Sequence, residues 1–261
     1  MNLNEVHFMK CIICQTESSK IFNAEILYKY NIDYYQCKHC GLIFTEKPYW
    51  LGEAYSDAIA DIDTGIMQRN IEFVNKMSVI LQAFFSANET FLDYGGGYGI
   101  FTRMMRDKGF NYLWTDKYAS PLLAKGFEYQ NETVSALTAF ELFEHFENPK
   151  EEIEKMLSLT KNIFFSTACY DDGMNIPDKD WWYWSYESGQ HISFYSKRTL
   201  EFLAGRYQLH YYNILGLHWL TDKTVKDKDL AGIERIYNKS NKNTVNYEYC
   251  VKDMKLLKDK I

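Results

Sequence analysis

Residues 90–99 of this 261-residue chain read TFLDYGGGYG, an apolar run that ends in an acid and is followed by four glycines. The run Thr90 to Tyr94 predicts a short buried strand, because it is apolar and is bounded by glycines. Glycine permits positive φ angles and lets the main chain pass close to a ligand. The apolar residues from 101 to 108 predict a helix, with Gly109 at its C-terminal cap. The stretch therefore predicts a strand, a ligand-binding loop and a helix, which begin a βαβ unit.

The glycine loop favours a cationic nucleoside over a dinucleotide. The fingerprint G-x-G-x-x-G fails from Gly95, where the last position is Ile100, and from Gly97, where it is Thr102. A carboxylate at Asp93 would also repel a pyrophosphate by Coulomb's law. S-adenosylmethionine has no phosphate and carries an ammonium and a sulfonium, so the acid favours this cofactor.

A second acid follows the next predicted strand, which covers residues 112–115. Asp116 comes 23 residues after Asp93, where an acid can accept hydrogen bonds from both ribose hydroxyls of a nucleoside. The alternative is an aspartate that only caps the next helix.

The chain around this loop alternates helix and strand patterns, which is typical of an α/β fold. Apolar residues recur at helical spacing from 65 to 85. Pro149 suits the first turn of a helix, and Ser196 is a predicted N-cap. Further strands are predicted over residues 134–140, 162–167 and 207–215, and further helices over residues 150–159 and 197–204.

Residues 64–215 resemble the class I S-adenosylmethionine-dependent methyltransferases, through Asp93-x-Gly95-x-Gly97-x-Gly99 and Asp116. The resemblance implies a Rossmann-like seven-stranded sheet with helices on both faces and an antiparallel last hairpin. It also implies that Asp93 and the glycines line the methionine end, that Asp116 holds the ribose, and that Phe140 and Glu141 lie at the edge of the site. The residues expected to bind the cofactor are Asp93, Tyr94, Gly95, Gly97, Gly99, Asp116, Phe140 and Glu141.

Two CxxC pairs precede this domain, Cys11 with Cys14 and Cys37 with Cys40. Each tight turn presents two thiolates, so the pairs together predict a closed tetrahedral zinc site with a structural role. The alternatives are a redox pair, which two such motifs in one stretch argue against, and chance pairs of buried thiols. Cys169 and Cys250 stand alone and are expected to be small buried hydrophobes. An N-terminal zinc-binding segment resembles a subgroup of methyltransferases that act on sugars or cell-surface glycans.

Residues 139–146 read AFELFEHF and follow the strand predicted from 134. Glu141, Glu144 and His145 would then lie at the carboxyl end of the sheet, where ligands bind. The segment resembles the ExxEH of ubiquinone-pathway and small-RNA O-methyltransferases, where these residues bind a metal. The three residues are therefore expected to bind Mg²⁺ or Mn²⁺, and the alternative is a hydrogen-bonded turn that shapes the acceptor pocket.

An aromatic stretch, residues 181–195, contains WWYW and GQHISFY. In the fold that the resemblance implies, this connection covers the acceptor. Aromatic faces suit the C–H surface of a sugar or a planar ring, and the alternative is a lid without direct contact. His191 is expected to act as a base near neutral pH or to complete the metal site. The expected catalytic residues are His191, His145 and Glu144.

The net charge and the distribution of apolar residues indicate which partners and which compartment to expect. The net charge is −6, and Lys residues in the tail after Leu220 alternate with acids, so nucleic acid is an unfavoured partner. No apolar run is long enough to span a bilayer, and residues 1–10 show no secretory signal, so the expected compartment is the cytoplasm. The sequence says nothing of the oligomeric state.

These features predict three regions: a zinc ribbon in residues 1–48, a methyltransferase domain in residues 64–220 and a polar, Lys-rich, helical tail in residues 221–261. The expected activity is methyl transfer from S-adenosylmethionine to a small hydroxyl-bearing acceptor such as a sugar. The alternatives are an RNA methyltransferase that uses the ribbon and the tail as its grip, and a non-catalytic scaffold with the same fold.

Overall fold

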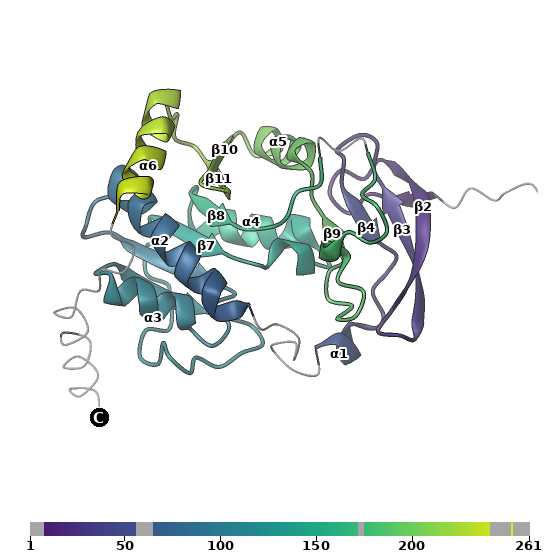
Figure 1. The fold of residues 1–261 in the computed structure, drawn as a ribbon, viewed down its shortest axis with the longest axis horizontal. Coiled ribbons are helices and arrows are strands. Elements are labelled where there is room, and N and C mark those ends of the chain that lie inside the picture. Colours follow the sequence, from purple (N-terminus) through teal and green to yellow (C-terminus); the bar gives the residue numbers. More distant parts are fainter. Residues whose placement is uncertain (1–7, 56–64, 172–174, 241–251, 253–261) are drawn as a thin grey trace, which may run out of the picture.

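The computed structural model describes residues 8–55, 65–171, 175–240 and 252, which form two sheets with helices around the larger one (Figure 1). Within the predicted tail, residues 241–251, which include Cys250, and residues 253–261 lie outside the described residues. No described helix combines the length and the apolar character that a membrane span requires.

The larger sheet has the strand order β10-β11-β8-β7-β5-β6. Strands β5 to β8 are parallel, while β11 runs antiparallel to both β8 and β10, so the predicted closing hairpin is confirmed. The strand bounds are β5 (Thr90–Tyr94), β6 (Asn111–Thr115), β7 (Ala136–Ala139), β8 (Ile163–Phe165), β10 (His210–Ile214) and β11 (Leu217–Thr221).

Within the described residues, this sheet contains six strands where seven were expected. At the free edge of β6, the seventh is reduced to one parallel bridge between Trp114 and Glu128. The backbone N–H and C=O of Trp114 are paired there at 2.9 and 2.8 Å. Gly126, two residues before Glu128, and Asn131, three residues after it, have φ angles of 85° and 74°, and these turn conformations leave too short an extended run for a strand.

Helices cover both faces of this sheet, as predicted. One face packs against α2 (Ile66–Phe84), α3 (Ile100–Asp107) and α6 (Asp227–Lys239), and the other against α4 (Pro149–Leu159) and α5 (Lys197–Arg206). Ser196 caps α5, because its hydroxyl accepts the N–H of Thr199 and the Thr199 hydroxyl accepts the N–H of Ser196. Helix α6 lies within the predicted tail.

The smaller sheet is antiparallel, has the order β1-β2-β3-β4-β9 and stands at the right of Figure 1. Its first four strands lie within residues 8–45, whereas β9 comes from the aromatic stretch. This sheet therefore extends beyond the region predicted for residues 1–48. The bounds of its strands are β1 (Phe8–Lys10), β2 (Glu17–Ile26), β3 (Tyr30–Gln36), β4 (Ile43–Thr45) and β9 (Ser193–Phe194). The remaining short elements, outside both sheets, are α1 (Leu51–Ala54) and the 3₁₀ turns η1 (Phe143–His145) and η2 (Trp182–Trp184).

Candidate functional site

The glycine loop turns sharply at the end of β5. The N–H groups of Gly95 and Gly96 both donate to the carbonyl of Thr115, at 2.9 and 3.1 Å, which fixes the loop to the end of β6. A Cβ at Gly96 would lie 2.6 Å from Asp93 Oδ2, whereas a Cβ at Gly97 would meet no protein atom within 4 Å. Gly97 has a φ of 53° and lines a cavity, so its bare backbone faces open space that a ligand can fill.

Asp93 lies directly beneath this loop and is 3% exposed. Its carboxylate accepts hydrogen bonds from the hydroxyls of Thr102, at 2.9 Å, and Thr138, at 3.2 Å. Burial, together with the charge of Asp116, raises the pKa of Asp93 to about 7, while the hydrogen bonds from Thr102 and Thr138 act in the opposite direction. A cation bound at the loop would favour the ionised form of this carboxylate.

Asp116 ties the glycine loop to the segment after β6. It accepts the N–H of Gly97 at 2.9 Å and those of Tyr118 and Ala119 at 2.7 and 2.8 Å. The two contacts within its own segment are those of an aspartate that begins a turn, and no described helix starts there, so Asp116 is not the helix cap that was its alternative role. Asp116 lies just outside the residues that line the cavity.

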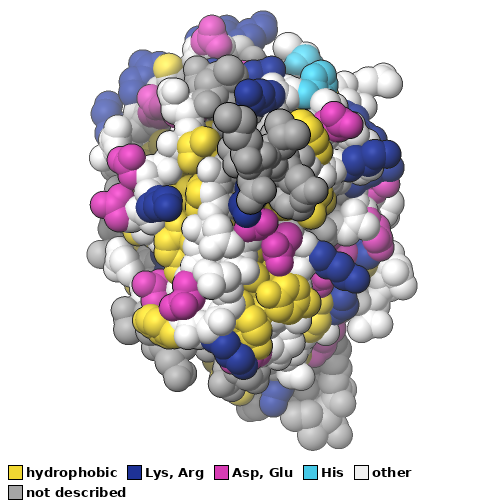
Figure 2. All heavy atoms as spheres, turned by 90° about the vertical axis from the view of Figure 1, so that its right-hand side faces the viewer, with side chains coloured by type: hydrophobic (Ala, Val, Ile, Leu, Met, Phe, Trp, Pro, Cys, Tyr) yellow, Lys and Arg dark blue, Asp and Glu magenta, His cyan; other side chains and the backbone are white. Residues whose placement is uncertain are grey.

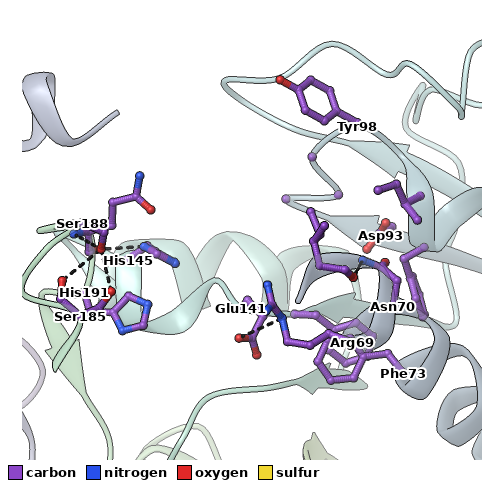
Figure 3. A pocket seen from close by; sticks show the side chains of 18 of the residues that line it. Arg69, Asn70, Phe73, Asp93, Tyr98, Glu141, His145, Ser185, Ser188 and His191 are labelled. Carbon is purple, nitrogen blue, oxygen red and sulfur yellow. Dashed lines mark hydrogen bonds and ion pairs between the residues drawn. The ribbon is translucent and has the colours of Figure 1, made fainter. Parts of the chain in front are cut away.

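The cavity has a volume of about 420 Å³ and runs from the glycine loop to the histidines (Figure 3). Of the predicted site residues, Asp93, Gly95, Gly97, Phe140, Glu141, His145 and His191 line it. Tyr94, Gly99, Asp116 and Glu144 do not. The Tyr94 hydroxyl instead donates to Glu152 on α4, at 3.0 Å, and a Cβ at Gly99 would lie 2.6 Å from the Cβ of Ala124.

The start of α2 forms a wall of the cavity that the sequence did not single out. Arg69, Asn70 and Phe73 face the cavity from this helix (Figure 3). The Phe73 ring stacks on Phe140, with ring centroids 4.3 Å apart. The helical spacing predicted α2, but spacing alone does not show which residues of its polar face point toward another element.

Glu141 occupies the middle of the cavity in a left-handed backbone conformation, with a φ of 49°. Such a conformation is uncommon for residues other than glycine and occurs often at functional sites. It is stabilised by Ser166, whose hydroxyl accepts the Glu141 N–H at 2.8 Å and donates to the Glu141 carboxylate at 2.6 Å. The Nε of Arg69 lies 3.7 Å from the other carboxylate oxygen, so this acid is tied to both sides of the cavity.

Glu144, His145 and His191 come together at the far end of the cavity from the glycine loop. One potential ligand atom from each residue lies within 4.8 Å of those of the other two, and the two imidazole rings are 5.0 Å apart. Glu144 is 0% exposed, and neither of its carboxylate oxygens has a hydrogen-bond partner among the described residues. Glu141 is not part of this cluster. An unpartnered buried carboxylate is costly, which indicates that the cluster receives a proton or a cation.

A backbone carbonyl sets the tautomer of His191. Its Nδ1 lies 2.7 Å from the carbonyl of Tyr183, and because a carbonyl only accepts, this Nδ1 carries the proton and Nε2 keeps a lone pair. His145 Nδ1 lies 3.1 Å from the carbonyl of Gln190 and 2.9 Å from the hydroxyl of Tyr55, which can donate to this nitrogen or accept from it.

Burial also controls the charges of this cluster. It lowers the pKa of His145 to about 3, with a contribution from His191, and lowers the pKa of His191 to about 4, so both rings are neutral at neutral pH. Burial and the neighbouring Glu141 raise the pKa of Glu144 to about 8.

The four predicted zinc ligands converge in the smaller sheet. Cys11 and Cys14 follow β1, while Cys37 and Cys40 lie between β3 and β4. The sulfur atoms of Cys11 and Cys40 are 3.6 Å apart, and those of Cys14 and Cys37 are 3.4 Å apart. Tetrahedral coordination with Zn–S bonds of about 2.3 Å places sulfurs about 3.8 Å apart, so the quartet fits such an ion.

Comparison with known proteins gives one family match. The family model described as a methyltransferase domain matches residues 67–213, more than half of the chain. No curated protein matches the chain by sequence.

Among solved structures, CalO1, a methyltransferase of calicheamicin biosynthesis in its SAH-bound form, is 14% identical with a TM-score of 0.38 over 65% of this chain and 59% of that one. An O-methyltransferase family 2 protein from Planctomyces limnophilus in complex with apigenin is 13% identical with a TM-score of 0.41 over 59% of this chain and 62% of that one. The plantazolicin methyltransferase BpumL is 11% identical with a TM-score of 0.44 over 74% and 89%. The chain thus spans less than two thirds of the first two proteins, and these likenesses are too distant to indicate its acceptor.

Proposed function

The chain belongs to the methyltransferase-domain family, and we propose that it transfers methyl from S-adenosylmethionine to a small hydroxyl-bearing acceptor. The proposed acceptor is a sugar bound at the histidine end of the cavity. The single observation that carries the proposal is the continuity of the cavity, which joins Asp93 and the glycine loop to His145 and His191.

The cofactor end is proposed to lie at the glycine loop, where Gly95 and Gly97 leave the backbone bare beside Asp93. S-adenosylmethionine supplies a methyl group that its sulfonium has already activated. Asp93 favours the positive charges of this ligand, and Phe140 and Glu141 line the cavity between the two ends. Asp116 keeps its proposed role toward the ribose, because three N–H groups leave part of the capacity of its two oxygens unused.

We propose that His191 takes the proton of the acceptor hydroxyl, with His145 and Glu144 beside it. Its neutral ring has a lone pair on Nε2, which is the form that a general base requires. Glu144 lies within the same cluster, and the positive ring that forms after proton transfer would favour the ionised form of its carboxyl, whose pKa is otherwise raised by burial.

The same three residues would hold a divalent cation, which would make an acceptor hydroxyl more acidic. One carboxylate and two imidazole nitrogens suit Mn²⁺ better than Mg²⁺, which prefers oxygen ligands. Glu141 would join the set only after leaving Ser166. At the N-terminus, we propose that the cysteine quartet holds a structural Zn²⁺, since four thiolates leave no open coordination position for catalysis.

The proposed acceptor surface includes Trp182, Ser185 and Ser188, which line the cavity beside His191. Trp182 is 75% exposed, whereas Tyr183 and Trp184 after it are buried. An exposed indole face beside hydroxyl groups suits the C–H surface and the hydroxyls of a sugar ring. A grip on RNA has less support, because the face of the N-terminal sheet mixes Lys and Arg with Asp and Glu among the described side chains (Figure 2).

The test is transfer of labelled methyl from S-adenosylmethionine to free hexoses, nucleotide-linked sugars and short RNA in parallel, with the His191→Ala variant as control. The proposal expects label in a sugar fraction that depends on His191. Label only in RNA, with a steep dependence of binding on salt, would contradict it.

A further inference from the structure

The segment that carries His191 is attached on its C-terminal side to the N-terminal unit, by which we mean residues 8–55. Ser193 and Phe194 form β9 and pair with Phe44 and Ile43 of β4. The N–H of Thr45, at the end of the same strand, donates to the carbonyl of Ile192 at 3.1 Å. The three residues after His191 are therefore fixed as an added strand of the N-terminal sheet.

The residues before His191 are also attached to the N-terminal unit, through side chains. The indole Nε1–H of Trp50 donates to the carbonyl of Gly189 at 2.8 Å, and Trp50 is 2% exposed. The side-chain amide of Gln190 donates to the carbonyl of Ala54 at 2.7 Å. The bond from Trp50 is buried, and such a bond holds a loop in one position because water cannot easily replace a missing partner.

The methyltransferase domain itself contacts this segment at the opposite member of the cluster. The N–H of Ile192 donates to the carbonyl of Glu144 at 2.9 Å. Ile192 is thus joined to Glu144 through its N–H and to Thr45 through its carbonyl. His145 Nδ1 also lies 3.1 Å from the carbonyl of Gln190, and the Ser193 hydroxyl donates to the carbonyl of Phe146 at 3.2 Å. The segment is therefore held between the methyltransferase domain and the N-terminal unit, and the position of His191 opposite Glu144 depends on contacts with both.

The last cysteine of the quartet is followed closely by β4, the strand that pairs with β9. Gly41 follows Cys40, has a φ of 80° and is separated from β4 by Leu42. Its carbonyl accepts hydrogen bonds from the hydroxyls of Tyr170 and Ser196, which flank the aromatic stretch on both sides. An ion bound by the cysteines would therefore fix the same turn that binds Ser196, directly after the stretch, and Tyr170, well before it.

We infer that the N-terminal unit is a positioning part of the acceptor end, in which Trp50 and the metal-bound cysteine turn hold residues 188–194 so that His191 faces Glu144. The inference rests on the proposed function for the role of His191, but not for the physical coupling. Trp50 is a positioning residue that acts through Gly189. The glycine loop lies on the other side of the cavity and does not depend on this attachment.

The first test compares Trp50→Phe with Trp219→Phe in the zinc-loaded full chain, by hydrogen–deuterium exchange of the peptide that covers residues 188–196. Both changes remove a buried indole, but Trp219 Nε1 has no hydrogen-bond partner among the described residues. Trp50→Phe should speed exchange in this peptide about fivefold, which is typical of one lost hydrogen bond. Unchanged exchange, or an equal rise in Trp219→Phe, would overturn the inference.

The second test removes the zinc with a chelator and measures both this exchange and the binding of S-adenosylhomocysteine. The inference expects that protection of residues 188–196 is lost while the dissociation constant stays within about threefold. Loss of both, or of neither, would overturn it. If the intact protein does not bind S-adenosylhomocysteine, the proposed function fails, and the exchange result still decides the coupling.

Discussion

The ionisation of Asp93 makes cofactor binding depend on pH in a predictable direction. The pKa of this carboxyl is raised to about 7, chiefly by burial. A cationic ligand favours the ionised form, so binding must release a proton wherever Asp93 is protonated in the free protein. The ionised fraction is about one half at pH 7, about one tenth at pH 6 and about one hundredth at pH 5. The dissociation constant of S-adenosylmethionine should therefore rise about tenfold per pH unit below 7 and level off above about pH 8.

The stability of the unliganded protein should depend on pH in the opposite direction. A raised pKa means that the fold prefers the protonated carboxyl, so this contribution to stability is fully present below the unfolded pKa of about 4 and is lost as pH rises through 7. Cofactor binding and unliganded stability should thus change in opposite directions over the same pH range.

The assay is isothermal titration calorimetry between about pH 5 and about pH 8 in two buffers with different protonation enthalpies. Close to one proton should be released per ligand at the acid end. Asp93→Asn should bind weakly and without this slope. Glu144→Gln is the matched control, because the pKa of Glu144 is raised to about 8 by burial and this carboxyl also titrates in the range. A flat dependence in the wild type, or a slope that follows Glu144, would refute the reasoning.

Three further substitutions test other parts of the site. Gly97→Ala should weaken S-adenosylhomocysteine binding at least about tenfold, because its Cβ would enter the cavity from a left-handed residue, whereas Gly52→Ala, which meets no atom within 4 Å, should leave calorimetric affinity unchanged. Cys37→Ser should lower the zinc content by elemental analysis and reduce the melting temperature, and full zinc occupancy would contradict the quartet. His191→Ala should reduce turnover by about a hundredfold or more while the cofactor dissociation constant changes little, and equal losses would point to a structural role.

The sequence predicted the parts of this protein that local rules determine. The glycines and Asp93 lie where a strand–loop–helix unit must place them, and Ser196 caps α5 because its capping box is local. The two CxxC turns likewise converge on one point, as their spacing requires.

Features that depend on distant contacts could not be predicted. The spacing of apolar residues in α2 gave no sign that Arg69 would reach Glu141. Likewise, nothing in the local sequence of Ser193 and Phe194 showed that they would join the sheet of the N-terminal unit. The left-handed conformation of Glu141 is stabilised by Ser166, the residue that follows β8. Such pairings arise from tertiary packing, which a pattern within one segment does not contain.

The measurement that tests the central claim most directly is a crystal structure of the full chain grown with S-adenosylhomocysteine and, separately, with a nicotinamide dinucleotide. We expect the first ligand to lie along Gly95 and Gly97, with its amino-acid end beside Asp93, and the second to leave the cavity empty. A dinucleotide bound against the glycine loop, with S-adenosylhomocysteine absent from it, would contradict the account.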